Sequence, residues 1–182
     1  MNWSEYKILS EKTLSSEFYC GKKDELLLHA VMGILTEMEE LLDNHMTENP
    51  DETNRGEEVF DGFWYLAILA REYNLEIPSS VTSSFEDPFE IVLNIIKKSL
   101  KILDFLKKKL YYNKPINQDL LALHVNEIIS LFVSYAGIYN INMEEGFDRN
   151  ISKLRARYGE KFSSERAINR NLQVERDILE GN

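Results

Sequence analysis

The stretches HAVMGILTEMEELLDN (29–44) and EEVFDGFWYLAIL (57–69) decide how this sequence is interpreted. Each has apolar residues at helical spacing, and each carries two acidic residues one turn apart, namely Glu37 with Glu40 and Glu58 with Asp61. Side chains three residues apart share one face of a helix, so two such helices packed together bring four carboxylates close to one another. Carboxylate oxygens are ligands that Mg²⁺ and Mn²⁺ prefer. The two stretches therefore predict a helical hairpin with an acidic metal site.

Two residues of the first stretch, Glu37 and Gly33, are energetically unfavourable in an ordinary amphipathic helix. Glu37 falls between Ile34 and Leu41 in the apolar periodicity, so its side chain points partly toward the core. A buried carboxylate is unfavourable unless a cation or hydrogen bonds compensate, which indicates a function for Glu37. Gly33 in mid-helix costs about 1 kcal/mol relative to alanine. We interpret it as a point where a partner helix or a ligand comes close.

The apolar spacing predicts an all-α fold. Glycine and proline are scarce, with 8 and 4 residues, which favours helices over a turn-rich β fold. Four long helices are expected over 24–46, 55–74, 89–111 and 118–140, with a short helix before them over 4–13. The length of 182 residues fits one domain, 1–182. We divide it into an acidic hairpin (24–75), a second hairpin (89–140) and a basic C-terminal arm (141–182).

The second hairpin resembles the first only faintly. Its first helix is amphipathic and is expected to bury Ile91, Ile95, Leu100, Leu103 and Leu106 behind a solvated lysine edge. The ending REYNLEIP of the first hairpin matches AGIYNINM in the second. Aligning the two hairpins from this match places Glu58 and Asp61 at the positions of His124 and Glu127. This similarity fits either a degenerate repeat that lost its acidic cluster or a shared helical composition.

Charge and composition restrict the partners. The net charge of −10 argues against nucleic acid as the main ligand, because phosphate backbones are bound by clustered Lys and Arg. A single cysteine, Cys20, fits a reducing compartment. The start of the chain lacks the apolar core of a signal peptide, and no segment has the uninterrupted apolar length of a membrane span. We expect a cytoplasmic protein that binds no membrane.

The C-terminal arm is the most arginine-rich part of the chain. Asn150, Lys153 and Arg157 fall on one helical edge, and Tyr158 follows next to Gly159. Such a row can donate charge-assisted hydrogen bonds to phosphate oxygens. The alternative is a solvated helix whose basic residues pair with the acidic surface. From about residue 163 we expect either a further helix or a tail that packs on a neighbouring subunit.

Three blocks in this order carry a resemblance to a known family. E-x-x-E in HAVMGILTEMEEL, E-x-x-D in EEVFDGFWYLAILA and the run NISKLRARYGEKFSSERAINR resemble the MazG-like, all-α nucleoside triphosphate pyrophosphohydrolases, which include the dimeric dUTPases. Two features depart from the pattern. Thr36 and Met38 stand where small residues are common, and the segment 85–140 is an addition relative to short members. The addition is similar to the two-hairpin arrangement of the dimeric dUTPases.

The resemblance implies a MazG-like helical bundle and a Mg²⁺-dependent hydrolase, with Mn²⁺ as a possible substitute. It assigns metal coordination to four residues, Glu37, Glu40, Glu58 and Asp61. It assigns the triphosphate to Asn150, Lys153, Arg157 and Tyr158, and a base or sugar contact to His29, for which a core-edge histidine is the alternative. Glu37 or Glu40 is the candidate general base. The family also implies a homodimer or homotetramer.

The expected reaction cleaves the α–β phosphoanhydride of a (d)NTP, releasing a nucleoside monophosphate and pyrophosphate. A narrower alternative is a pyrophosphatase selective for dUTP or dCTP. A third hypothesis, which is not an enzyme, is a non-catalytic helical module that binds nucleotide or protein. The complete set of four acidic positions argues against this module.

Overall fold

The computed structural model describes the part of the chain that comprises residues 15, 17–73, 87–159, 162 and 164–181. This part is all-helical, which confirms the predicted all-α class. Its four long helices are α2 (Lys22–Met46), α3 (Glu52–Tyr73), α4 (Pro88–Tyr112) and α5 (Gln118–Ile138). They match the four long helices expected from the sequence. The short helix expected over 4–13 lies outside the described residues.

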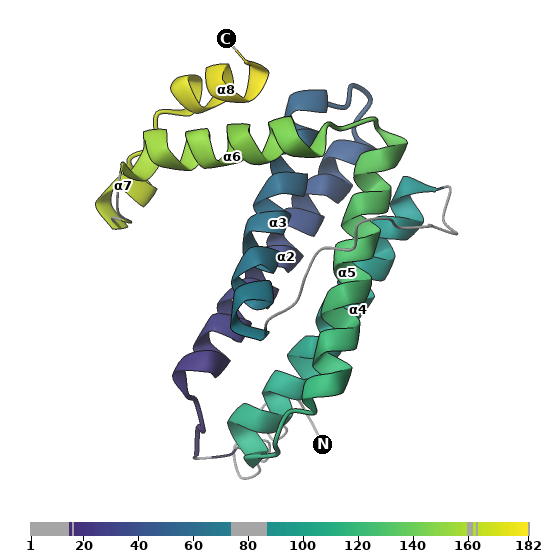
Figure 1. The fold of residues 1–182 in the computed structure, drawn as a ribbon, viewed down its shortest axis with the longest axis vertical. Coiled ribbons are helices and arrows are strands. Elements are labelled where there is room, and N and C mark those ends of the chain that lie inside the picture. The colour runs from purple at the N-terminus through teal and green to yellow at the C-terminus, as the bar shows by residue number, and fades with distance from the viewer. Residues whose placement is uncertain (1–14, 16, 74–86, 160–161, 163, 182) are drawn as a thin grey trace, which may run out of the picture.

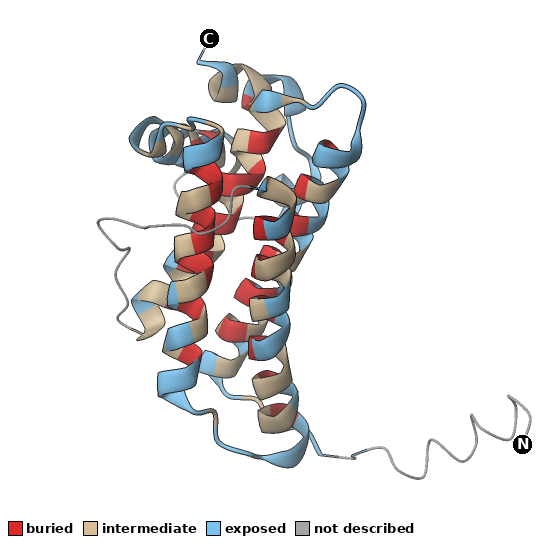
Figure 2. Ribbon diagram, turned by 90° about the vertical axis from the view of Figure 1, so that its right-hand side faces the viewer, coloured by how far each residue is buried: buried red, intermediate tan, exposed pale blue. Residues whose placement is uncertain are grey.

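The long helices form a bundle of two hairpins. Helix α2 packs against α3 and α4, and α5 packs against α4 and α3 (Figure 1). Buried residues lie on the helix faces that point toward one another, while the outer faces are exposed (Figure 2). The core between the hairpins includes Ile34, Phe63, Ile95 and Phe132. Burial of these apolar side chains is the main force that holds the hairpins together.

Contrary to the expectation that no segment has the apolar length of a membrane span, helix α5 is long and apolar enough to cross a membrane by length and composition alone. In the bundle, however, 44% of its apolar window is buried inside the protein. Its buried residues, such as Val125, Ile128 and Phe132, belong to the shared core. The helix therefore has the packing of a core element.

The C-terminal arm forms three helices, α6 (Met143–Tyr158), α7 (Ser164–Ile168) and α8 (Leu172–Glu180). Helix α6 runs across α3, and α8 packs on α6 and α3 (Figure 1). The contacts that anchor α8 include an ion pair, in which Arg176 Nη1 lies 2.7 Å from Asp51 Oδ2, and a hydrogen bond of 2.6 Å from Arg149 to the carbonyl of Leu179. The further helix expected after residue 163 is thus present, and it packs on its own chain.

The start of α3 differs from the expected residue 55. The Oδ1 atom of Asp51 accepts hydrogen bonds from the backbone N–H groups of Thr53 and Asn54, at 2.9 and 3.1 Å. Asn44, which is buried near the end of α2, both donates to and accepts from the backbone of Asp51 at 2.8 Å. This capping satisfies the orphan N–H groups of the first turn, so the helix begins at Glu52.

The buried face of α4 differs by one position from the expected one. Leu100, which we expected inside, is 49% exposed. The buried line instead passes through Ser99 and Ile102 before it reaches Leu106. Ser99 follows Ile95 by four residues and Ile102 follows Ser99 by three, so these side chains share the helix face that points toward the bundle. Leu100 lies outside this buried stripe.

Glycines allow the closest helix contacts. A Cβ atom at Gly33 would lie 2.1 Å from Cζ of Tyr65, so the Tyr65 ring of α3 lies directly against the α2 backbone. This confirms that Gly33 permits the close approach of a partner helix. At Gly62 a Cβ atom would meet the Phe132 ring of α5 at 2.4 Å. Both glycines therefore set the packing distance of α3 from its neighbours.

Candidate active site

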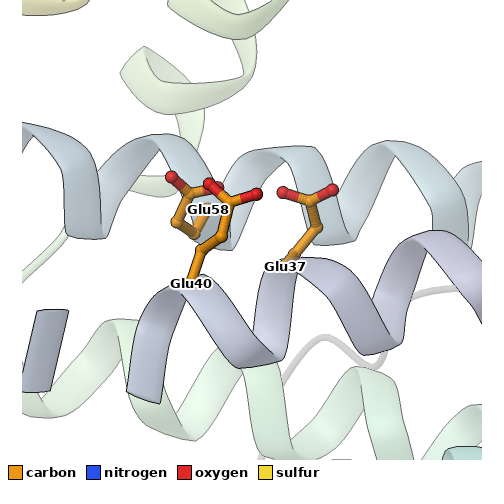
Figure 3. Close-up of side chains that lie close together, drawn as sticks. All are labelled: Glu37, Glu40 and Glu58. Atoms are coloured by element: carbon orange, nitrogen blue, oxygen red, sulfur yellow. The ribbon is translucent and has the colours of Figure 1, made fainter. Parts of the chain in front are cut away.

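The acidic hairpin brings three of the four predicted metal ligands together. Glu37 and Glu40 project from α2 toward Glu58 of α3 (Figure 3). One carboxylate oxygen from each residue lies within 4.8 Å of the others. Their spacing of three residues and the packing of α2 on α3 account for this convergence. The group is called the carboxylate cluster below.

Burial makes the carboxylate cluster electrostatically unfavourable without a cation. Glu37 and Glu58 are 9% and 3% exposed, whereas Glu40 is exposed. Burial raises the pKa of Glu37 from 4.5 to about 7 and that of Glu58 to about 10, and Glu58 donates a hydrogen bond to Glu37. Two buried carboxyl groups this close share a proton when no other positive charge is present. A divalent cation fits this donor set, because hard oxygen ligands of net negative charge suit Mg²⁺.

The fourth predicted ligand, Asp61, has a different set of partners. Lys153 Nζ lies 2.7 and 2.6 Å from the two oxygens of Asp61, and Asn150 Nδ2 lies 2.5 Å from Oδ1. Lys153 is 0% exposed and also donates to Glu57 over 2.9 Å. Asn150 and Lys153 thus hold Asp61 from behind, and neither of them lines the cavity that the cluster faces. Asp61 does line that cavity.

A cavity of about 850 Å³ opens between the acidic hairpin and the C-terminal arm. The carboxylate cluster and Asp61 line it on the side of α2 and α3. Residues of the C-terminal arm line the other side, and three of them are arginines: Arg155, Arg157 and Arg170. The volume is in the range of small-molecule sites. The cavity therefore has a group of carboxylates from α2 and α3 and a group of arginines from the C-terminal arm in its lining.

Aromatic side chains form a further part of the wall. His29, Trp64 and Tyr65 line the cavity, and His29 packs edge-on against the other two rings, with centroids 6.2 and 5.6 Å away. Tyr158 and Phe162 line it from the arm, with their rings 5.2 Å apart. Rings of this kind offer flat apolar surfaces to a planar group. His29 is exposed and is thus not buried in the core.

The basic wall is held by a residue from α8. Arg157 donates from Nε and Nη2 to the two oxygens of Glu175, at 2.9 and 2.5 Å. Arg170 donates to the same carboxylate, with Nη2 2.7 Å from Oε2. Arg155 is exposed. It forms no ion pair among the residues that the structure describes.

The sequence-predicted residues therefore fall into two groups. The cavity brings together Glu37, Glu40, Glu58, Asp61, His29, Arg157 and Tyr158. Asn150 and Lys153 lie behind Asp61, where they support a carboxylate. Residues that sequence reasoning missed are Glu57, Trp64, Arg155, Arg170 and Glu175. Trp64 carried a local signal, because it falls one turn after Asp61 on the same helix face. Arg155 and Arg170 lie in the arginine-rich run 150–170 that carries the family resemblance, but their spacing alone did not single them out.

Comparisons with protein-family models, with curated proteins and with solved structures gave no match.

Proposed function

We propose that the chain is a Mg²⁺-dependent nucleoside triphosphate pyrophosphohydrolase. The observation that carries this proposal is the cavity of about 850 Å³ with the carboxylate cluster on one wall and three arginines on another. A nucleoside triphosphate needs both, because its phosphates require cations and its catalytic metal requires oxygen ligands. The resemblance of the acidic motifs to the MazG-like enzymes supports the same activity.

Glu37, Glu40 and Glu58 are the residues that would hold the cation, with Asp61 beside them. A bound Mg²⁺ supplies charge neutralisation for a phosphate chain and polarises its phosphorus–oxygen bonds. Lys153 and Asn150 keep Asp61 in place through hydrogen bonds of 2.7 and 2.5 Å. The support from behind fixes the carboxylate orientation, as outer partners of metal ligands do elsewhere.

The chain's own groups account for the other parts of the proposed reaction. Arg155, Arg157 and Arg170 bind the phosphate oxygens through charge-assisted hydrogen bonds. The rings of Trp64 and Tyr65 pack against the base. Glu40 or Glu37 accepts the proton of the water that attacks the α–β phosphoanhydride. The products are a nucleoside monophosphate and pyrophosphate.

The decisive experiment is pyrophosphate release from a panel of dNTPs and NTPs in the presence of Mg²⁺. We expect turnover of at least one nucleotide, its loss in EDTA, and a loss of at least about 100-fold in Glu58→Gln. Glu39→Gln is the matched control, because Glu39 is exposed on α2 between the cluster members Glu37 and Glu40. Failure of every nucleotide, with tight binding retained, would instead identify a non-catalytic nucleotide-binding module.

The same panel separates the broad activity from its narrower variant. Selectivity for dUTP or dCTP would appear as turnover of one pyrimidine nucleotide over the others. A site built to hydrogen-bond a base edge rejects wrong bases strongly, whereas stacking on a flat ring discriminates weakly. Because the described base-side wall is dominated by rings, we expect turnover of several bases.

A further inference from the structure

Glu175 is a buried acid in a part of the chain that carries no catalytic motif. It lies on α8 and is 3% exposed, yet both of its oxygens are fully used. Arg157 donates hydrogen bonds to both Oε1 and Oε2 in a bidentate pair. Arg170 donates to Oε2 from Nη2 and from Nε, over 2.7 and 3.2 Å. Although burial acts in the opposite direction, hydrogen bonds from the two arginines hold the pKa of Glu175 below its usual value. The residue is therefore charged at neutral pH.

The position of this carboxylate relative to the cavity is informative. Arg157 and Arg170 line the cavity, whereas Glu175 does not. Both arginines meet Glu175 through Nε and Nη2, so the N–H groups of each Nη1 stay outside this pairing. Two guanidinium groups on one carboxylate carry a net positive charge, which the longer 3.9 Å contact of Arg170 Nη2 with Glu57 Oε1 offsets only in part. Arg157 also forms a hydrogen bond with the Tyr158 side chain. The arrangement holds two cationic groups side by side with donors left for an anion.

We propose that Glu175 is a positioning residue that orients Arg157 and Arg170 as a pair for a polyphosphate chain. The proposal rests on the proposed function, because it concerns the phosphate side of the same cavity. Without the Glu175 carboxylate the two guanidinium groups repel each other, and both arginine side chains become free to adopt other rotamers. An incoming anion must then immobilise both long side chains, which lowers its affinity. Arg155 is exposed and lines the same cavity, so it adds a third guanidinium to this lining.

An inhibitory role for Glu175 predicts the opposite change in anion affinity. If Glu175 occupied the arginines in place of a phosphate, its removal would free them and increase the affinity for anions. The two roles differ in sign, so a binding measurement separates them without any assumption about turnover.

The test uses the full chain and inorganic tripolyphosphate with Mg²⁺ as the probe, measured by calorimetry. We expect Glu175→Gln to weaken tripolyphosphate binding about tenfold or more, since a hydrogen-bonded charge has been removed. The dissociation constant for Mg²⁺ alone should stay the same, because the carboxylate cluster lies on α2 and α3. An unchanged or higher tripolyphosphate affinity in Glu175→Gln would overturn the proposal.

Asp51→Asn is the matched control for the attachment of α8. It weakens the Arg176–Asp51 ion pair, which also anchors α8, and it keeps an oxygen that can cap α3. Wild-type tripolyphosphate affinity in this variant is expected. A loss equal to that of Glu175→Gln would show that only the docking of α8 matters, and would overturn the positioning role.

Tripolyphosphate binding and nucleotide turnover of the wild-type protein together separate this proposal from the proposed function. If wild-type protein binds tripolyphosphate but turns over no nucleotide, the enzyme reading fails while the role of Glu175 is still decided by its variant. If wild-type protein binds no tripolyphosphate in Mg²⁺, the anion wall itself is wrong and both proposals fail.

Discussion

The Nζ atom of Lys153 lies 2.6 Å from Oδ2 of Asp61, with the lysine side chain fully buried. The same Nζ lies 2.9 Å from Oε1 of Glu57. A lysine is rarely buried unless it is paired, and here it neutralises two carboxylates that line the cavity, from a position behind them. Within the described residues, the carboxylate cluster in front has no ion pair of its own. The lysine thus supports Asp61 and Glu57 and forms no ion pair with the carboxylate cluster.

Replacing Lys153 with methionine is expected to destabilise the fold by about 3 kcal/mol. The change leaves Asp61 without its cation and Glu57 with only the longer 3.9 Å contact to Arg170, although both carboxylates keep some solvent contact. The measurement is urea unfolding. Lys98→Met is the control, because the ion pair of Lys98 with Glu127 is more exposed and should cost below about 1 kcal/mol. Equal losses in the two variants would contradict the supporting role.

The metal-free protein is expected to lose stability as the pH rises from 5 to 8. Burial raises the folded-state pKa of Glu37 from 4.5 to about 7 and that of Glu58 to about 10, so the folded state binds more protons than the unfolded state. The free energy of unfolding then falls with pH, by up to about 1.4 kcal/mol per pH unit for each carboxyl group. Urea unfolding in EDTA at several pH values measures this slope.

Mg²⁺ should reverse this trend, since the cation replaces the shared proton and stabilises the folded state more at pH 8 than at pH 5. Glu58→Gln should show a smaller slope in EDTA and little stabilisation by Mg²⁺. A stability of the EDTA-treated protein that rises over this pH range would show that the two carboxyl groups are ionised in the fold.

Two glycines of α3 are expected to respond oppositely to alanine. A Cβ atom at Gly62 would lie 2.4 Å from the Phe132 ring, so Gly62→Ala should overpack the contact with α5 and destabilise by about 1–3 kcal/mol. Gly56 has no neighbouring atom within 4 Å of such a Cβ, so Gly56→Ala should stabilise by about 1 kcal/mol through helix propensity. Thermal unfolding of both variants measures the difference. The same sign in both would refute the packing role of Gly62.

Nucleotide binding is expected to change the fluorescence of Trp64. This residue is 36% exposed and lines the cavity beside His29 and Tyr65. The chain has 2 tryptophans, so Trp3→Phe leaves Trp64 as the single reporter. We expect saturable quenching by a nucleotide with Mg²⁺ in Trp3→Phe and none from Trp64→Phe. Unchanged emission of Trp3→Phe at saturating nucleotide would place the base elsewhere.

Local periodicity was enough to predict the helices and the position of Glu37. The four long helices and the inward tilt of Glu37 follow from residue spacing, which a helix converts directly into shared faces. The start of α3 was misplaced because the cap at Asp51 depends on Asn44, seven residues earlier. Leu100 was misplaced because apolar residues lie on more than one face of α4.

The partners of the basic residues could not be predicted in the same way. The sequence puts Asn150, Lys153 and Arg157 on one edge of α6, but a shared edge does not say which groups face it. Packing of α6 on α3 turns the first two toward Asp61, and the return of α8 brings Glu175 to Arg157. These contacts span 18 to 92 residues and depend on tertiary structure alone.

The two walls of the cavity belong to different parts of the chain. The carboxylates lie on helices that also form the bundle core, whereas the arginines lie on α6 and on the connection between α7 and α8, in an arm that packs mainly on itself and on α3. Substitutions in the arm should therefore alter ligand choice at little cost to folding, while those in the hairpin affect both at once. We expect descendants of this chain to diversify in the substrate they accept sooner than in the metal they use.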